Sequence, residues 1–300
     1  MWLRDMQSYK SLIWQHNGEE KTLKKVLLED MNISVRLLYT LKKENRVLIN
    51  EKTMKFHDIV NNQDIIKVEL PKEKNDYEAF EKEIKIIYEN DDLIVVEKEP
   101  YMVVHPTKGH PDKTLANALV YTFHKKGILG KIRFVNRLDR DTSGILIVAK
   151  NSYCHSVMTK DDKMWEMDKT YAAVVEGEME DSEGTIDMPI LKDEDGIKRI
   201  VHEDGQRAIT HYKIAKRLKG ATLLEVRLET GRTHQIRVHF SHMGHPLLGD
   251  ELYGGSMKDI KRQALHCSSL GFYSPRESDK IIVRSELPHD IKNLIETLSV

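Results

Sequence analysis

The chain is most informative at Asn136-Arg137-Leu138-Asp139-Arg140-Asp141-Thr142-Ser143-Gly144, which leads directly into Ile145-Leu146-Ile147-Val148-Ala149. The first segment is polar and small, as expected of a loop, and the second predicts a buried β strand. Loops held by buried strands commonly carry functional side chains. Two carboxylates, Asp139 and Asp141, alternate with two arginines here, and a nearby guanidinium favours the ionised form of an aspartate. Asp139 is therefore a candidate nucleophile or base, although an ordinary loop salt bridge has the same local pattern.

Strand-like segments outnumber helical ones on both sides of this loop, and many are separated by short turns. A helix is expected at residues 114–121, where apolar and polar side chains follow a helical spacing. The pattern does not fit the regular alternation of a doubly wound parallel sheet, and predicts an α+β domain around a mixed, mostly antiparallel central sheet. The predicted strands are residues 84–88, 93–96, 145–148, 171–176, 208–215, 222–228 and 234–240.

The last of these strands belongs to a second conspicuous segment, Gly231-Arg232-Thr233-His234-Gln235-Ile236-Arg237-Val238-His239. Side chains alternate along a strand, so Gln235, Arg237 and His239 would share one face. Three polar groups on one face fit a polar cleft better than a dry core. A metal is not expected, because His234 and His239 would point to opposite faces and no acidic partner lies at ligand spacing.

Residues 1–72 form a second predicted unit, joined by a charged linker at 73–83 to the domain at 84–300. Two short helices, at residues 22–30 and after the N-cap Ser34, precede strands at 47–49 and 65–68. Between residues 35 and 55, six basic residues face two acidic ones. A solvated helix face gives the same composition. The order of elements, however, resembles the αL-type RNA-binding module first seen in a ribosomal small-subunit protein. That resemblance implies a small α/β module with phosphate contacts from Arg36, Lys42, Lys43 and Arg46.

The composition limits what the chain can bind and where it works. The net charge is −1, so any RNA binding has to come from local basic patches rather than from the overall field. Cys154 and Cys267 lie far apart and give no disulfide or metal spacing. No run approaches the roughly 18 apolar residues of a membrane span, and the first residues do not look like a secretory signal. We expect a soluble cytoplasmic protein, and a monomer by default.

Four ordered motifs in residues 84–300 resemble the RluA/RluD-type family of RNA pseudouridine synthases. Arg-Leu-Asp-x-x-Thr-Ser-Gly is present at residues 137–144, and Lys-x-Tyr is present at 169–171. The Gly-Arg-Thr-His-Gln-Ile-Arg-Val-His pattern is complete at 231–239, and Gly-His-Pro…Gly-Asp…Tyr-Gly runs over 244–254. Family members commonly have His before Arg-Leu-Asp, where this chain has Asn136. We expect a supporting or RNA-contacting role at that position, so the change bears on substrate preference more than on activity.

The resemblance implies isomerisation of uridine to pseudouridine in structured RNA, with ribosomal RNA as the first expectation and transfer RNA as an alternative. No cofactor is implied. Asp139 would start glycosidic cleavage, as nucleophile or as base, in a catalytic cleft of the sheet. Arg237 would pair with Asp139, and Tyr171 would stack on the uracil while its hydroxyl helps to remove a proton. The target uridine would have to leave its stack. Further RNA contacts are expected from Arg137, Arg140, Arg232, His234 and Gln235.

Two other functions stay open on the sequence. The same fold could bind RNA without catalysis, although the presence of Asp139, Tyr171 and Arg237 argues against that. A hydrolase of a nucleoside or sugar would need a second carboxylate as its acid, and Asp141 is the nearest candidate. Release of free uracil would support the hydrolase, whereas retention of uracil in the RNA would exclude it.

Overall fold

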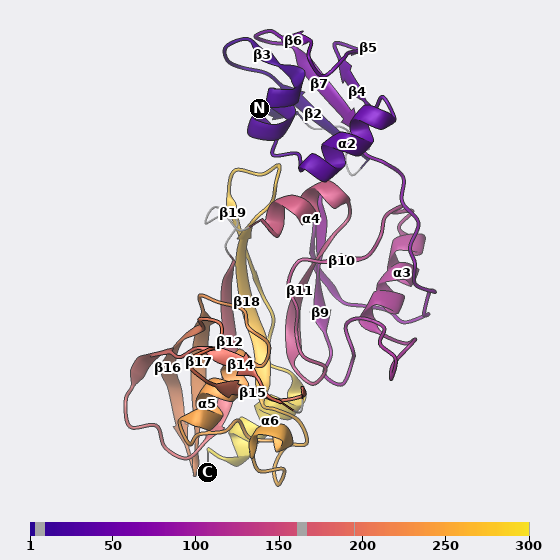
Figure 1. The fold of residues 1–300 in the computed structure, drawn as a ribbon. Helices are drawn as coiled ribbons and strands as arrows, with labels where there is room; N and C mark the ends of the chain where they lie inside the picture. Colours follow the sequence, from indigo (N-terminus) through magenta and orange to yellow (C-terminus); the bar gives the residue numbers. More distant parts are fainter. Residues whose placement is uncertain (4–9, 161–166, 195, 300) are drawn as a thin grey trace.

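The computed structural model describes residues 1–3, 10–160, 167–194 and 196–299, and Figure 1 shows their arrangement. Ten of the described strands form one sheet, in the order β13-β16-β17-β12-β18-β11-β9-β8, with β10 pairing with β11 and β19 with β18. The pairs are antiparallel except for β11 and β18, which run parallel. The predicted α+β class and mixed, mostly antiparallel sheet are therefore confirmed. The strands are β8 (Ile86–Glu89), β9 (Leu93–Lys98), β10 (Arg133–Phe134), β11 (Ser143–Ala149), β12 (Asp168–Glu176), β13 (Glu183–Asp187), β16 (Ile209–Leu218), β17 (Ala221–Leu228), β18 (Leu265–Tyr273) and β19 (Lys280–Arg284).

Strand β11 is the spine of this sheet, and every one of its seven residues is buried. Its apolar side chains pack with those of β9 and of helix α3 (Leu115–Lys125). Helix α3 begins with a capping box, in which Thr114 and Asn117 satisfy each other's backbone groups. The predicted helix at 114–121 is thus confirmed. The remaining elements of this part are α4 (Ser152–Met158), β14 (Ile190–Lys192), β15 (Arg199–Val201), α5 (Gln235–His242), η4 (Glu251–Tyr253) and α6 (His289–Thr297).

The strand predicted at 234–240 is wrong, because the segment forms helix α5. His234 takes the left-handed conformation, with φ of +57°, and breaks the chain direction before the helix. The Gln235 side chain then accepts a hydrogen bond from the Arg232 backbone N–H at 2.9 Å. All residues from 235 to 240 are buried, so no apolar stripe marks the helical period. On a helix, Gln235 and His239 lie on one side and Arg237 on roughly the opposite side, so the shared polar face does not exist.

The N-terminal part is built from a five-stranded sheet, a two-stranded sheet and helices, all separate from the large sheet (Figure 1). The predicted helix at 22–30 is present, with its second half wound as a π-helix. Ser34 caps the next helix as predicted, accepting from the Leu37 N–H at 3.3 Å. Strand β2, which pairs with β7, has no counterpart in the prediction. The elements are β1 (Trp2–Leu3), β2 (Ser11–Gln15), β3 (Lys21–Thr22), α1 (Leu23–Lys25), η2 (Val26–Asp30), α2 (Val35–Lys43), β4 (Val47–Ile49), β5 (Lys52–Thr53), β6 (Ile59–Val60) and β7 (Ile65–Glu69).

The N-terminal part is packed against the larger part rather than hanging from a free linker. Tyr153 and Val157 of α4 belong to the hydrophobic cluster of the N-terminal part. Arg276 makes a buried two-point ion pair with Asp92, at 2.8 and 2.9 Å, and donates to the Ser11 carbonyl at 3.2 Å. The packing lies beside α4, at the end of β11 far from the 136–144 loop (Figure 1).

Gly144, the second residue of β11, permits the close parallel pairing of β11 with β18. Its φ is +119°, and a Cβ atom there would lie 2.3 Å from the carbonyl oxygen of Cys267. We expect Gly144→Ala to lower the free energy of unfolding by about 3 kcal/mol or more, since strain and overlap add. Gly127→Ala is the matched control. Its φ is also positive, but a Cβ atom added there would have no neighbouring atom within 4 Å. It should cost about 1 to 2 kcal/mol. Urea unfolding measures both, and equal losses would contradict the close approach.

Candidate active site

Asp139 lines a cleft that has a volume of about 610 Å³. Its side chain is 27% exposed, so the carboxylate is within reach of a bound molecule. The cleft is lined by four groups of residues that are far apart in the sequence: 103–110, 137–141, 233–237 and 249–263. The loop feeding β11 and the start of α5 thus meet, as the two most conspicuous motifs of the sequence predict.

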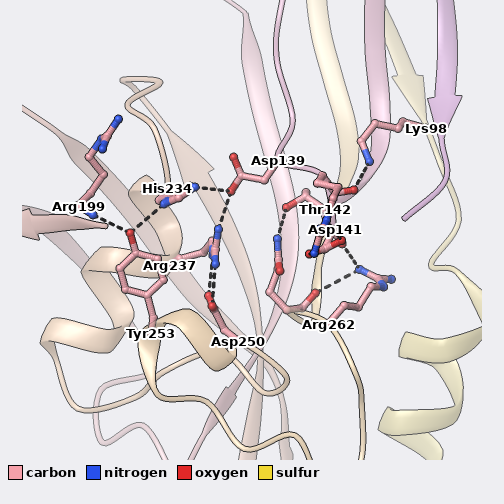
Figure 2. Close-up of polar contacts among 12 residues, drawn as sticks. Lys98, Asp139, Asp141, Thr142, Arg199, His234, Arg237, Asp250, Tyr253 and Arg262 are labelled. Atoms are coloured by element: carbon pink, nitrogen blue, oxygen red, sulfur yellow. Dashed lines mark hydrogen bonds and ion pairs between the residues drawn. The ribbon is translucent and has the colours of Figure 1, made fainter. Parts of the chain in front are cut away.

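Arg237 joins Asp139 to a second, fully buried carboxylate (Figure 2). Two of its nitrogens bind Asp250 at 2.6 and 2.7 Å, and Nη1 donates to Asp139 Oδ2 at 3.1 Å. Burial alone would lower the pKa of Arg237, but the hydrogen bonds and charges of Asp250 and Asp139 outweigh burial and raise it above its ordinary value. The guanidinium is therefore a fixed cation, oriented by Asp250 and directed at Asp139. The ion pair expected between Arg237 and Asp139 is present.

His234 lies beside Arg237 and faces the same carboxylate oxygen of Asp139 (Figure 2). Its Nε2 lies 3.8 Å from Asp139 Oδ2, and its Nδ1 lies 2.9 Å from the Tyr253 hydroxyl. That hydroxyl also accepts from the Arg199 backbone N–H at 2.9 Å, and we assign its own proton to the bond with Nδ1. Nδ1 is then an acceptor and Nε2 carries the proton that faces Asp139. Burial lowers the pKa of His234, which favours this neutral form.

Two buried basic side chains, Lys98 and Arg262, hold the turn that carries Asp139. Lys98 Nζ donates to the carbonyl of Arg140 at 2.7 Å, and Arg262 Nη1 donates to the carbonyl of Asp141 at 3.0 Å. Arg262 is itself fixed by Asp290 at the start of α6, with nitrogen–oxygen distances of 2.6 and 2.9 Å. The backbone immediately after Asp139 therefore has little freedom, and the carboxylate is kept facing the cleft.

The lowered pKa of Lys98 should make the free energy of unfolding depend on pH. Burial lowers its pKa from 10.5 to about 7, against the opposing charge of Asp141. Between these pH values the unfolded chain binds more protons at this amine than the folded chain does, so the free energy of unfolding rises with pH. We expect Lys98→Met to abolish that rise in urea unfolding across the window. Lys213→Met, at a lysine whose side chain is 70% exposed, should leave the rise intact. A rise that persists in the Lys98 variant would contradict the assignment.

Asn136 has a backbone partner rather than a place in the cleft. Its side-chain amide donates to the carbonyl of Ile145 at 3.1 Å and accepts from the N–H of Ile147 at 2.8 Å. The residue is buried. Asn136 therefore holds β11 against the segment before the loop. It does not take the RNA-contacting role considered for the histidine that is common at this position.

Tyr171 lies on β12 opposite Cys267, within the core, and is not among the residues that line the cleft. Burial, with the charge of Asp139 adding to it, raises the pKa of Tyr171 well above 10. Its hydroxyl is therefore neutral at physiological pH and cannot serve as a preformed base. The residue as a whole is 7% exposed, so a uracil could meet only a small part of its ring.

The other residues expected to contact RNA divide into exposed and buried groups. Arg137 and Arg140 line the cleft, although Arg140 is engaged by Asp141 through two contacts of 2.8 Å. Arg232 is exposed and bonded to the carbonyl of Arg207. The RNA contact expected from Gln235 does not fit its position. The residue is 2% exposed, and its side-chain amide is hydrogen-bonded to neighbouring backbone and to Thr210. It supports the loop before α5 and is not available to RNA.

On the N-terminal part, Arg36, Lys42 and Lys43 are exposed, whereas Arg46 is half-buried and paired with Glu44. In the described residues no three His, Cys, Asp or Glu side chains gather as they would around a metal ion. Within the same part of the chain, no helix is long and apolar enough to cross a membrane.

Asp250 and Tyr253 were not among the site residues predicted from the sequence. Asp250 orients Arg237, and the Tyr253 hydroxyl orients His234. The Arg237 guanidinium also lies over the Tyr253 ring, 4.9 Å from its centre. Both residues belong to the Gly-Asp…Tyr-Gly motif at 244–254. The motif could therefore have marked them as site residues, but it does not reveal that they contact Arg237 and His234.

Comparisons with known proteins agree with this geometry. A family model described as RNA pseudouridylate synthase matches residues 92–242. The RNA pseudouridine synthase YjbO of Bacillus subtilis is 38% identical over 271 residues, which cover 89% of this chain and 96% of the relative. Ribosomal large subunit pseudouridine synthase D of Xanthomonas campestris is 35% identical over 272 residues, covering 85% and 82%. The solved human RNA Pseudouridylate Synthase Domain Containing 4 shares the fold, with a TM-score of 0.59 at 21% identity over 71% of this chain and 92% of that one.

Proposed function

Because the chain belongs to the RNA pseudouridylate synthase family, whose reaction is the isomerisation of uridine to pseudouridine in RNA, we propose that Asp139 is the carboxylate that begins this reaction. The observation that carries the proposal is the position of Asp139 in an open cleft, 3.1 Å from a guanidinium that Asp250 holds in place. A carboxylate so aimed can attack the sugar or remove a ribose proton, and both routes lead to cleavage of the glycosidic bond.

The reaction balances without a redox partner or a transferred group, so we propose that it needs no cofactor and no metal. The bond from ribose to the ring nitrogen breaks, the uracil turns, and a bond forms from ribose to carbon-5. Carbon-5 loses a proton and the freed ring nitrogen gains one. Arg237 acts as a positioning residue for Asp139, and the Nε2 proton of His234 faces the same oxygen. We propose that Tyr171, which is buried on β12 but close enough to feel the charge of Asp139, packs its ring against the uracil.

The substrate we propose is structured large-subunit ribosomal RNA. Relatives called ribosomal large subunit pseudouridine synthase D, at 35 to 40% identity, support this choice over transfer RNA. The target uridine must leave its stack to reach the cleft, which favours loops and distorted helices. The exposed Arg137, Arg140 and Arg232 would meet the flanking phosphates. Action on ribosomal RNA fits a cytoplasmic location, and we propose that the chain acts there as a monomer.

We propose the division into an RNA-binding module at 1–72, a linker at 73–83 and a catalytic domain at 84–300. The separate hydrophobic cluster of the module and the exposed Arg36, Lys42 and Lys43 support it. The linker is laid along the catalytic domain, since Asn75 bonds to the carbonyl of Gly130 at 2.6 Å and to the N–H of Ile132 at 2.9 Å.

The proposed function is tested with bacterial large-subunit ribosomal RNA transcribed in vitro, which contains no pseudouridine. The purified chain should convert uridine to pseudouridine, with no free uracil in solution and no added metal or cofactor. Nucleoside analysis of the RNA and chromatography of the supernatant measure the two. Uracil released into solution would instead support the hydrolase, and RNA binding without either product would support a protein that only binds.

A further inference from the structure

Helix α2 displays an apolar pair on its solvent face. Val35 is 74% exposed and Tyr39 is 72% exposed, and no other large apolar side chain among the described residues is as exposed as either. They are four residues apart and therefore neighbours on the helix surface. The opposite face of the helix is buried through Leu37, Leu38 and Leu41. The fold thus keeps α2 in place without burying Tyr39.

Tyr39 stands in the middle of a group of cations. Counting along the helix, Arg36 is three residues before it, and Lys42 and Lys43 are three and four residues after it. Residues at these spacings surround the central side chain on the surface of a helix. Residues 35–43 include no acidic residue, and Glu44, which follows them, is paired with Arg46. The surface is therefore an aromatic ring bounded by three exposed positive charges and one aliphatic side chain.

We propose that Tyr39 is a base-stacking subsite, on which an unpaired nucleobase of the substrate RNA packs while Arg36, Lys42 and Lys43 bind the phosphates beside it. This inference rests on the proposed function, and adds to it a contact with a base rather than with the backbone. An aromatic ring set among cations binds single-stranded nucleic acid through stacking, which every base can provide. A second copy of the chain would bring the same three cations together, and that repulsion makes it a poor occupant.

The packing of the module gives the subsite a consequence for substrate choice. Tyr153, Val157 and Arg276 hold the module at the end of β11 opposite the Asp139 loop. A strand of seven residues spans roughly 20 Å, so the stacked base and the target uridine are held at least about that far apart. The enzyme would then favour RNA in which an unpaired base lies at a fixed distance from the uridine.

The test measures binding of the full-length chain by fluorescence anisotropy. The probes are a short fluorescein-labelled oligouridine and a blunt RNA duplex of equal length, each at several salt concentrations. Tyr39→Ala should weaken binding to the oligouridine about tenfold, leave the duplex unaffected, and leave the salt dependence unchanged, because stacking releases no counterions. Arg36→Gln should weaken binding to both probes and lower the salt slope by about 0.7 for the single strand. Tyr39→Phe should behave as wild type.

Ile59→Ala is the matched control, since Ile59 is an exposed apolar residue elsewhere on the module. It should change nothing. Equal affinity of Tyr39→Ala and wild type for the oligouridine would overturn the subsite, and so would a change in salt slope. Concentration-dependent dimers that vanish in Tyr39→Ala would overturn it in favour of a second copy. The failure of the proposed function is distinguishable, because it appears as a wild-type chain that makes no pseudouridine.

Discussion

Replacing Asp139 by Asn is expected to slow pseudouridine formation by at least about 10⁴-fold in single-turnover experiments with saturating RNA. The amide has the shape of the carboxylate, but it can neither attack the sugar nor accept a proton. Arg237 keeps its two contacts with Asp250, at 2.6 and 2.7 Å, so the cleft should keep its form. RNA affinity should therefore change little, and quantification of pseudouridine together with anisotropy separates binding from chemistry.

Asp141→Asn is the control for this prediction, because Asp141 is two residues away and is the second carboxylate of the loop. Its side chain is paired with Arg140, which is itself exposed, and lies outside the Asp139–Arg237–Asp250 ion pairs. Its carbonyl, which Arg262 holds at 3.0 Å, is unaffected by the change. The rate should stay within about tenfold of wild type. Loss of activity as severe as in Asp139→Asn would mean that both carboxylates take part, as in a hydrolase.

Arg237→Met should destabilise the fold as well as remove activity. The substitution strips the Asp250 carboxylate, whose side chain is 0% exposed, of its partner. An uncompensated buried charge costs about 3 to 5 kcal/mol, and urea unfolding at neutral pH measures the loss. Activity falls for a different reason, since Asp139 loses the cation 3.1 Å away that aims it.

A double variant separates these two effects of Arg237. Arg237→Met combined with Asp250→Leu removes both buried charges, and replacement of a buried ion pair by apolar side chains is often neutral for stability. We expect the double variant to regain most of the stability that Arg237→Met loses, and to remain inactive. Recovery of activity along with stability would show that Arg237 serves the fold alone, and the proposed role in positioning Asp139 would be wrong.

The loop that carries Asp139 could be predicted from the sequence because the pattern that marks it is local. A polar loop before a wholly apolar run predicts a loop feeding a buried strand, and Asp139 and β11 follow that prediction. Helix α5 was mistaken for a strand because its residues 235–240 are all buried, which leaves no polar face to reveal the helical period. The left-handed His234, which separates α5 from the loop before it, has no signature beyond the preceding Gly231.

The contacts between segments that are distant in the sequence could not be predicted from local patterns. Asp250 and Arg237 are thirteen residues apart, and Arg262 reaches Asp141 across 121 residues, so no periodicity connects them. The packing of the N-terminal module was also not predictable. Tyr153 and Val157 look like ordinary core residues of α4, yet they belong to the hydrophobic cluster of the module. The exposed cations of α2, in contrast, were predictable, because a helix that buries Leu37, Leu38 and Leu41 must turn its charges outward.

The measurement that tests the account most directly is a map of pseudouridines in the ribosomal RNA of a strain that lacks this protein. Deletion should remove pseudouridine from a site in the large subunit, and the wild-type chain should restore it. The Asp139→Asn chain, present at the same level in the cell, should leave the site as uridine. Restoration of the modification by Asp139→Asn would contradict the assignment of the catalytic carboxylate, and an unchanged map in the deletion strain would contradict the proposed substrate.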